Sequence, residues 1–196
     1  MHWLNEPPSW HDDGARLVVS TGAATDFWRE THYGFIRDSG HLRHDAAAAG
    51  DFTAEAAFGG AYATLYDQAG LMVRLDDRTW VKAGVEFVDG RRLLSCVVTR
   101  GFSDWSLAAG HEAPEAVRLR LRREGTALHV EWRPAAAAGD AIPFAPLRLA
   151  YLPEGPATVG PMCCSPERAG FQAWFADLRI ARGIRPKPAA APGGEK

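Results

Sequence analysis

The stretch YDQAGLMVRLDDRTWVKAGVEFVDGRRLLSCVVTRGFSDW, residues 66–105, decides the fold of this chain. It contains three segments in which apolar residues recur at every second position, and a turn signal, Asp89-Gly90, separates the last two. Successive side chains of a strand point to opposite faces, so this period predicts strands. Three consecutive strands joined by short turns form an antiparallel meander.

Each predicted strand has one apolar face and one mixed face. We assign the apolar residues at alternate positions to the core: Leu71, Val73, Leu75, Val81, Ala83, Val85, Phe87, Leu94, Cys96 and Val98. The opposite face combines aromatic, charged and small residues: Gly70, Met72, Arg74, Trp80, Lys82, Gly84, Glu86, Ser95, Val97 and Thr99. Because Arg74, Lys82 and Glu86 share this face, the meander predicts one surface rich in polar groups.

Two interpretations of the mixed face stay open on the sequence. Antiparallel sheets commonly have one solvated face, on which charged residues serve solubility. Trp80 and Met72 are costly on such a face, and Gly70 and Gly84 inside strands indicate the close approach of a neighbouring segment or a ligand. The second interpretation predicts a binding surface, with Trp80 as one of its contacts.

Residues 25–35, TDFWRETHYGF, are dense in aromatic and polar side chains without clean periodicity. Such a density suits a loop folded over a binding cleft, with Trp28, Arg29 and Tyr33 as ligand-contacting residues. An equally good interpretation is that the aromatic residues of this segment cap a hydrophobic edge.

Further candidates lie at the two ends of the meander. Tyr66, Asp67 and Gln68 precede its first strand. Their hydroxyl, carboxylate and amide groups are of the kind that hydrogen-bonds sugar hydroxyls, while aromatic rings cover sugar faces. Asp104 and Trp105 lie in a short polar segment, which we interpret either as a turn that bonds its own backbone or as a loop that presents the tryptophan to a ligand.

The segment from Phe52 to Phe58 alternates like the meander and predicts another half-buried strand, ended by a Gly59-Gly60 turn. If this strand pairs with the meander, Glu55 faces the same way as Glu86. Further short strands follow at regular spacing, with turn signals between them. This pattern predicts an all-β fold, a two-sheet antiparallel β-sandwich.

Length and charge bound the function. The chain has 196 residues and a formal net charge of -2, without a basic patch or tail, so nucleic acid and anionic membranes are not expected partners. We expect one domain over residues 1–184 and a disordered tail over 185–196, which is rich in Pro, Gly and Ala. No apolar run is long enough to span a bilayer, and the N-terminus lacks a secretory signal, so we expect a cytoplasmic protein.

The cysteines and histidines give no metal or cofactor prediction. The chain has three cysteines, two of them adjacent at Cys163-Cys164, and reduced thiols are the simplest interpretation of this odd number. His41, His44 and Asp45 have a spacing that suits a metal on a helix, but the flanking sequence supplies no second shell or further ligand. Solvated loop histidines are therefore the better interpretation.

Several segments together resemble the DUF1349 family, over about residues 3–184: TDFWRETHYGF, YDQAGLMVRLD, WVKAGVEFVDG, VVTRGFSDWS, VGPMCCSP and GFQAWFADLRI. The resemblance implies a concanavalin A-like jelly roll with a concave face, in a structural group that contains both sugar-binding proteins and glycoside hydrolases. It also implies a possible role in regulating carbohydrate metabolism through a protein contact. It supplies no catalytic residues, and the ExDxE strand of laminarinase-like members does not occur in this chain.

Three functions follow as hypotheses. The first is a noncatalytic, lectin-like protein that binds a carbohydrate or small metabolite on the concave face. The second is a glycoside-active enzyme that uses Glu86 with Glu55, Asp67 or Asp104; against it, Lys82 beside Glu86 is expected to hold that carboxylate ionised, which does not suit a general acid. The third is a regulatory or interaction protein of carbohydrate metabolism. A homodimer is possible in each case.

Overall fold

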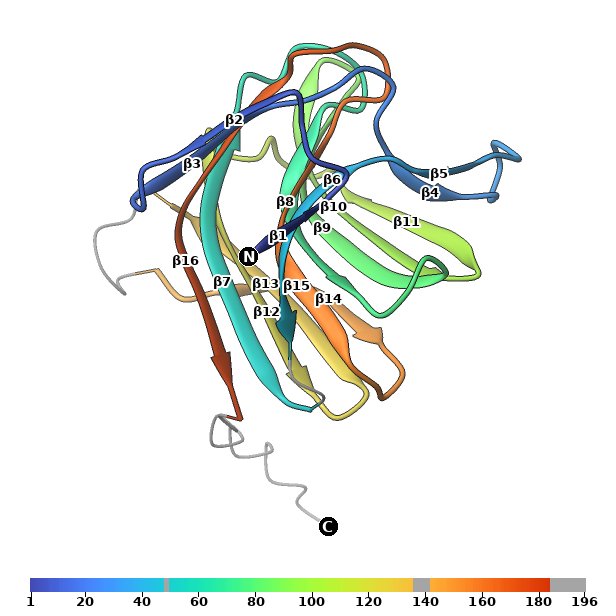
Figure 1. Cartoon of the computed structure of the whole chain (residues 1–196), viewed down its shortest axis with the longest axis vertical. Helices are drawn as coiled ribbons and strands as arrows, with labels where there is room; N and C mark the ends of the chain where they lie inside the picture. The colour runs from blue at the N-terminus through green and yellow to red at the C-terminus, as the bar shows by residue number, and fades with distance from the viewer. Residues whose placement is uncertain (48–49, 136–141, 184–196) are drawn as a thin grey trace.

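The structure of the chain, a computed structural model, describes residues 1–47, 50–135 and 142–183. These residues form two seven-stranded antiparallel sheets and one two-stranded hairpin, and they include no helix. Figure 1 shows the two large sheets as the layers of a sandwich. The predicted all-β, two-sheet antiparallel fold is confirmed. The expected tail at 185–196 lies outside the described residues.

We call the sheet that contains the meander sheet A and the other one sheet B. Sheet A has the order β1 (His2–Leu4), β6 (His41–Ala47), β15 (Ala157–Cys164), β8 (Gln68–Arg74), β9 (Thr79–Val88), β10 (Arg91–Arg100) and β11 (Phe102–Ala108). Sheet B has the order β14 (Ala145–Tyr151), β13 (Ala127–Pro134), β12 (Ala116–Glu124), β7 (Phe52–Gly60), β16 (Gln172–Arg182), β3 (Arg16–Ser20) and β2 (Ser9–Asp12).

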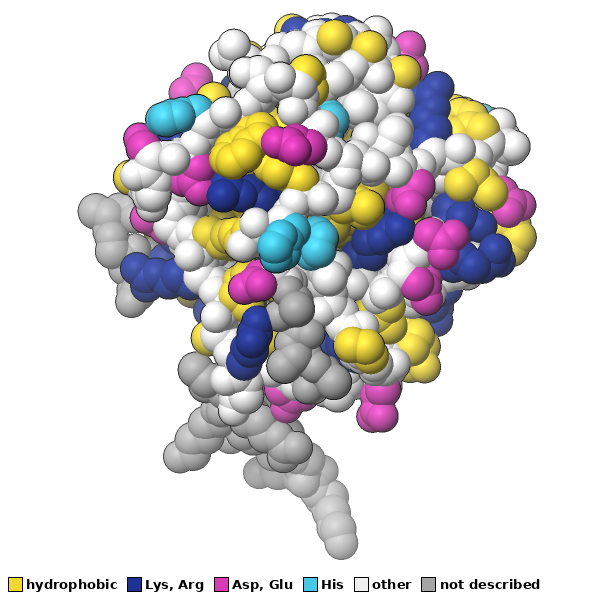
Figure 2. All heavy atoms as spheres, in the orientation of Figure 1, with side chains coloured by type: hydrophobic (Ala, Val, Ile, Leu, Met, Phe, Trp, Pro, Cys, Tyr) yellow, Lys and Arg dark blue, Asp and Glu magenta, His cyan; other side chains and the backbone are white. Residues whose placement is uncertain are grey.

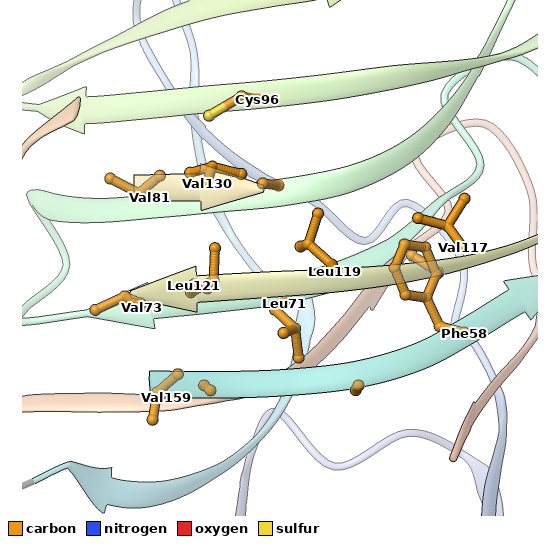
Figure 3. Close-up of a cluster of buried hydrophobic side chains, with 14 of the residues drawn as sticks. Phe58, Leu71, Val73, Val81, Cys96, Val117, Leu119, Leu121, Val130 and Val159 are labelled. Atoms are coloured by element: carbon orange, nitrogen blue, oxygen red, sulfur yellow. The ribbon is translucent and has the colours of Figure 1, made fainter. Parts of the chain in front are cut away.

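The meander β8–β9–β10 has the predicted parity. Leu71, Val81 and Cys96 lie in the core between the sheets, each less than 3% exposed. Figure 3 shows them opposite side chains of sheet B such as Leu119 and Val130. The two-residue period therefore placed the correct side chains inside, because a slip of one residue would have turned the entire apolar set outward.

Gly70 and Gly84 face each other across β8 and β9. A Cβ atom built on either would lie 2.0 Å from a backbone oxygen of the opposite strand, that of Ala83 or Ala69. The close approach that the sequence indicated is therefore made by the partner strand. No side chain rises from the sheet at this point, between Lys82 and Glu86.

A third layer covers part of the outer face of sheet A. It is a hairpin of β4 (Phe27–Arg29) and β5 (Ile36–Asp38), which Figure 1 shows beside β11. The hairpin closes a second apolar cluster, separate from the main core: Phe27, Trp28, Leu42, Met72, Trp80, Val97, Met162 and Cys164. Trp80 and Met72 are buried because this layer excludes water from them.

Three local predictions were wrong. Phe52–Gly60 forms β7, which pairs with β12 and β16 in sheet B, so Glu55 does not face the same way as Glu86. Gly59 and Gly60 belong to that strand and form no turn. The segment of Asp104 and Trp105 is part of β11, because its backbone pairs with β10.

The histidine prediction also needs correction. His41 lies in β6 and is 4% exposed, with Nδ1 2.7 Å from the carbonyl oxygen of Asn5 and Nε2 accepting from the backbone N of Gly22 at 3.0 Å. Burial lowers the pKa of His41, more than the bond to Asn5 raises it. His41 is a buried structural residue, whose two bonds tie distant segments together.

Candidate functional site

A pocket opens between the hairpin and the outer face of sheet A, with a cavity volume of about 110 Å³. This is several times the roughly 10–15 Å³ that one water molecule needs, so the pocket has room for a small molecule. Its lining combines aromatic rings with charged side chains: Asp26, Trp28, Tyr33, Phe35, Arg37, Tyr66, Lys82, Glu86, Val97, Trp105, Pro166 and Glu167.

Lys82 and Asp26 form an ion pair in the floor of the pocket. Nζ of Lys82 donates to Oδ1 of Asp26 at 3.0 Å, and the lysine side chain is 5% exposed. Burial by itself lowers the pKa of Lys82, but attraction to Asp26 and other acidic groups outweighs it, so this pKa is raised. Oδ1 also accepts the backbone N of Phe27 at 2.8 Å. Lys82 is therefore held charged and in one place.

Glu86 lies on the same strand face and is bonded through one oxygen. Its Oε2 accepts from Oγ of Ser95 at 2.8 Å and from Nε1 of Trp105 at 2.9 Å. Burial raises the pKa of Glu86, and the nearby Lys82 lowers it by less. Lys82 therefore favours the ionised form of Glu86, as expected, but burial opposes ionisation and has the larger effect. Oε1 of Glu86 accepts no hydrogen bond from the described residues, although Glu86 lines the pocket.

Aromatic rings form the walls. The hydroxyls of Tyr33 and Tyr66 lie 2.9 Å apart and join the hairpin to the opposite rim. Tyr33 packs edge-on against Trp28 at 5.5 Å, and Tyr66 against Trp105 at 6.2 Å between ring centroids. The bond to Tyr33, together with burial, raises the pKa of Tyr66. The walls thus offer ring faces and edges beside hydroxyl groups.

Tyr66 has a φ of 66°, a left-handed conformation that is uncommon outside glycine. The following residue explains how it is held there. Asp67 is fully buried, bonds Arg168 at 2.6 Å and Oγ of Ser165 at 3.0 Å, and accepts the backbone N of Ala63. Asp67 is therefore a structural residue that fixes the loop carrying Tyr66, and it does not line the pocket.

The other predicted residues lie around the pocket without lining it. Trp80 is 1% exposed beneath the hairpin. Arg29 is buried and donates from Nε to the carbonyl of Gly101 at 3.2 Å, which fastens β4 to the chain just before β11. Gln68 lies behind the floor, with Nε2 3.4 Å from Asp26.

Two predicted carboxylates lie elsewhere. The Asp104 side chain is 70% exposed and lies 3.6 Å from Arg148 of sheet B. Glu55 pairs with Arg118, also in sheet B. Of the eleven ligand-contact residues predicted, the pocket brings together six: Trp28, Tyr33, Tyr66, Lys82, Glu86 and Trp105.

Sequence reasoning missed Asp26 as a pocket residue, together with Phe35, Arg37 and Glu167. A weak signal existed for Asp26, because a lysine on a buried face needs an anionic partner and Asp26 opens the aromatic segment. The choice among the acidic residues depended on the path of the hairpin. Glu167 follows β15, a strand remote in sequence, and no local pattern connects it with the site.

The described residues group no metal centre, and the face drawn in Figure 2 has no purely basic patch. Within the described ranges, no three or more His, Cys, Asp and Glu side chains are grouped to hold a metal ion. No helix of that part of the chain is long and apolar enough to cross a membrane. On the face seen in Figure 2, acidic and basic side chains are interspersed.

Comparison with known proteins gives the family. The family described as "Protein of unknown function (DUF1349)" matches residues 3–182. This chain belongs to the DUF1349 family. The DUF1349 chain is 42% identical over 180 residues to "Regulation of enolase protein 1" of Saccharomyces cerevisiae, covering 91% of this chain and 87% of that protein.

Solved structures agree on the fold of this DUF1349 protein. A crystal structure of "a functionally unknown protein" from Saccharomyces cerevisiae matches with a TM-score of 0.86 and 39% identity, over 94% of this chain and 97% of that one. A xylan β-1,4-xylosidase from Bacillus halodurans matches with a TM-score of 0.62 and 16% identity, over 85% of this chain and 33% of the enzyme. An alginate lyase from Klebsiella pneumoniae matches with a TM-score of 0.55 and 11% identity, over 88% and 83%. At these last two identities the likeness concerns the fold alone.

Proposed function

We propose that this protein binds a small, neutral, polyhydroxylated molecule of the carbohydrate class in the pocket, without catalysis. The observation that carries the proposal is the polar floor beneath aromatic walls: Lys82 and Glu86 are buried there, and Glu86 has an oxygen without a partner among the described residues. A ligand hydroxyl can donate to a carboxylate or accept from a carboxyl group. Aromatic rings cover the apolar faces of the ligand.

The charges of the pocket favour a neutral ligand over a phosphorylated one. Its lining has two basic side chains, Lys82 and Arg37, and three acidic ones, Asp26, Glu86 and Glu167. Lys82 is already bonded to Asp26. Sites for phosphate instead concentrate unpaired Arg or Lys, or backbone N–H groups.

The positions of the carboxylates favour binding over glycoside hydrolysis. Glycosidases place two carboxyl groups about 5–9.5 Å apart across the scissile bond. None of the three carboxylates suggested as partners of Glu86 is placed to act as the second catalytic group. Glu55 is in the other sheet, Asp67 is bonded to Arg168, and Asp104 faces Arg148. Asp26 shares the pocket, but its Oδ1 is engaged by Lys82 and the Phe27 backbone.

A thermal-shift and calorimetry screen with neutral monosaccharides, oligosaccharides and polyols tests the proposal. We expect at least one of these ligands to bind, and Glu86→Gln to weaken its binding about tenfold or more, because the amide replaces an oxygen with a group that only donates. Glu55→Gln is the matched control, with the same substitution on the outer face of sheet B, and should bind like wild type. Absence of binding across the panel by the folded protein, or equal effects of both substitutions, would contradict the proposal.

A second candidate comes from the relative in yeast. Identity of 42% over 91% of the chain, with a protein named for the regulation of enolase, supports a regulatory role through a protein contact. Co-purification of tagged wild type with enolase from the same cells tests it, with a folded but unrelated β-sandwich as control; failure to retain enolase would contradict it. Homodimerisation and a cytoplasmic location stay predictions.

A further inference from the structure

A second hollow, which we call the edge groove, adjoins the pocket at the free edge of sheet A. It lies between the turn of the hairpin and the start of β11, has a cavity volume of about 600 Å³, and is lined by Trp28, Thr31, His32, Tyr33, Phe102, Ser103, Asp104 and Trp105. Three of these side chains, Trp28, Tyr33 and Trp105, also line the pocket. The two hollows therefore adjoin each other and share aromatic walls.

The edge groove repeats the chemistry of the pocket in a more open form. Phe102 is 61% exposed and Tyr33 is 43% exposed, although both are large aromatic residues. A single exposed aromatic residue is ordinary, but two in one hollow together with polar groups are typical of a contact surface. His32 packs against the Tyr33 ring at 4.9 Å, and the exposed Asp104 carboxylate lies in the same groove.

An alternative occupant of the edge groove is a peptide strand paired with β11, and it fits this edge less well than a ligand that stacks on the aromatic rings. The backbone N of Arg29 donates to Oγ of Ser103 at 2.9 Å, and its Nε donates to the Gly101 carbonyl at 3.2 Å. The hairpin is thus bonded to the chain at the start of β11, which leaves less room there for an added strand, although the Phe102 ring stays exposed. Strand addition needs a run of free backbone groups, whereas a ligand that rests on ring faces does not.

We infer that the ligand of the pocket is an oligosaccharide chain, with its terminal sugar in the pocket and the next one or two sugars in the edge groove. This inference rests on the proposed function and adds the length of the ligand. The pocket has room for a small molecule, and the larger groove continues from it along the same aromatic side chains. Phe102 and the outer part of the Tyr33 ring serve as stacking surfaces for the following sugars.

Calorimetry with two neutral series tests the length: xylose to xylotetraose, and glucose to cellotetraose. In the series that binds, we expect affinity to rise about tenfold or more from the monosaccharide to the trisaccharide. Phe102→Ala should lower affinity for the trisaccharide by about three- to tenfold, the worth of one aromatic contact, and leave the monosaccharide unaffected. Leu149→Ala on β14 is the matched control, since Leu149 is 66% exposed on the edge of the other sheet, and it should change neither.

The outcomes separate the two proposals. Equal affinity for monosaccharide and trisaccharide, with no effect of Phe102→Ala, overturns the inference on length and leaves the binding function standing if Glu86→Gln still weakens binding about tenfold or more. No binding by any member of either series overturns the inference on length, and the wider panel of sugars and polyols then decides the binding function. A synthetic peptide of alternating valine and lysine tests the alternative that a peptide strand binds the edge groove. Phe102-dependent binding of that peptide, but of no sugar, would assign the groove to a strand and overturn the inference.

Discussion

The outer faces of the two sheets start from the same sequence pattern and end in different environments. On sheet B, alternation places Glu55, Arg118 and Arg120 outward, where Glu55 pairs with Arg118 at 3.4 Å and Arg120 with Glu131 at 2.9 Å, all partly exposed. On sheet A, Lys82 and Glu86 stand at equivalent alternate positions but are 4% and 7% exposed. The hairpin of β4 and β5, together with the loops that carry Tyr66 and Glu167, covers this part of sheet A, and no such cover is described over Glu55 and Arg118.

The comparison teaches that the charged residues on one face of a strand do not show whether that face is exposed to water or covered by another part of the chain. Exposed ion pairs contribute little, since water and salt compete for both charges. When another layer buries such side chains, each charge needs an oppositely charged or hydrogen-bonding partner. The layer that excludes water must then supply this partner. Asp26, at the start of the hairpin, is that partner for Lys82.

The largest expected contrast is between the tryptophans of the two outer faces. Trp80→Ala removes a side chain that is 1% exposed beneath the hairpin and should lower the free energy of unfolding by about 3–5 kcal/mol. Trp174→Ala on sheet B removes a half-buried ring on which Arg16 stacks at 4.3 Å, and the lost stacking is worth about 0.5–1 kcal/mol. Urea unfolding followed by circular dichroism measures both. Equal losses would mean that the hairpin does not seal the second cluster.

The ion pairs give the next contrast. Lys82→Met leaves Asp26 without its cation in a buried position and should cost about 3–5 kcal/mol of stability. Arg118→Met breaks a partly exposed pair with Glu55 and should cost about 0–1 kcal/mol. The same unfolding assay compares them, and the double variant Lys82→Met/Asp26→Asn should recover part of the loss. A loss at Lys82 as small as that at Arg118 would show that water reaches the floor.

Glu86 predicts a pH dependence on the covered face. Burial raises its pKa in the folded protein, so the folded state binds the proton more tightly than the unfolded state, whose value is about 4.3. The contribution of Glu86 to stability is therefore fully present below about pH 4.3 and is lost as pH rises through the folded pKa. Glu86→Gln cannot lose a proton, so its stability relative to wild type should increase across that interval and then level off. Unfolding curves from pH 4 to 8 measure this, and a difference that is flat with pH would refute it.

The smallest expected effect concerns the bond that joins hairpin and rim. Tyr33→Phe removes the hydroxyl that lies 2.9 Å from that of Tyr66 and should cost about 0.5–1.5 kcal/mol. The same change should lower the pKa of Tyr66 towards its usual value, because the bond to Tyr33 is the main cause of its rise. Ultraviolet titration of tyrosine ionisation measures the pKa, with Tyr151→Phe on β14 as control. An unchanged pKa of Tyr66 in the Tyr33→Phe variant would show that the bond to Tyr33 is not what raises it.

The candidate site was predictable in part. Lys82 and Glu86 followed from parity on β9, and Tyr66 and Trp105 from their position at the ends of the meander. Glu55 was misplaced because alternation identifies a strand but not the sheet that receives it, and β7 lies between β12 and β16. Asp104 was misassigned because it points to the opposite side of β11 from Trp105, so it lines the edge groove but not the pocket.

The sequence by itself determined the strands of the meander, the side chains that form the core and the antiparallel sandwich, because a two-residue period acts over a few neighbouring residues and its apolar half must be buried. Only the tertiary structure decided that residues 27–38 cover the outer face of sheet A and that Asp26 meets Lys82 across 56 positions of the chain. Such a contact depends on the packing of whole elements against one another. No local pattern encodes it, so the pocket exists only once the hairpin has folded over the sheet.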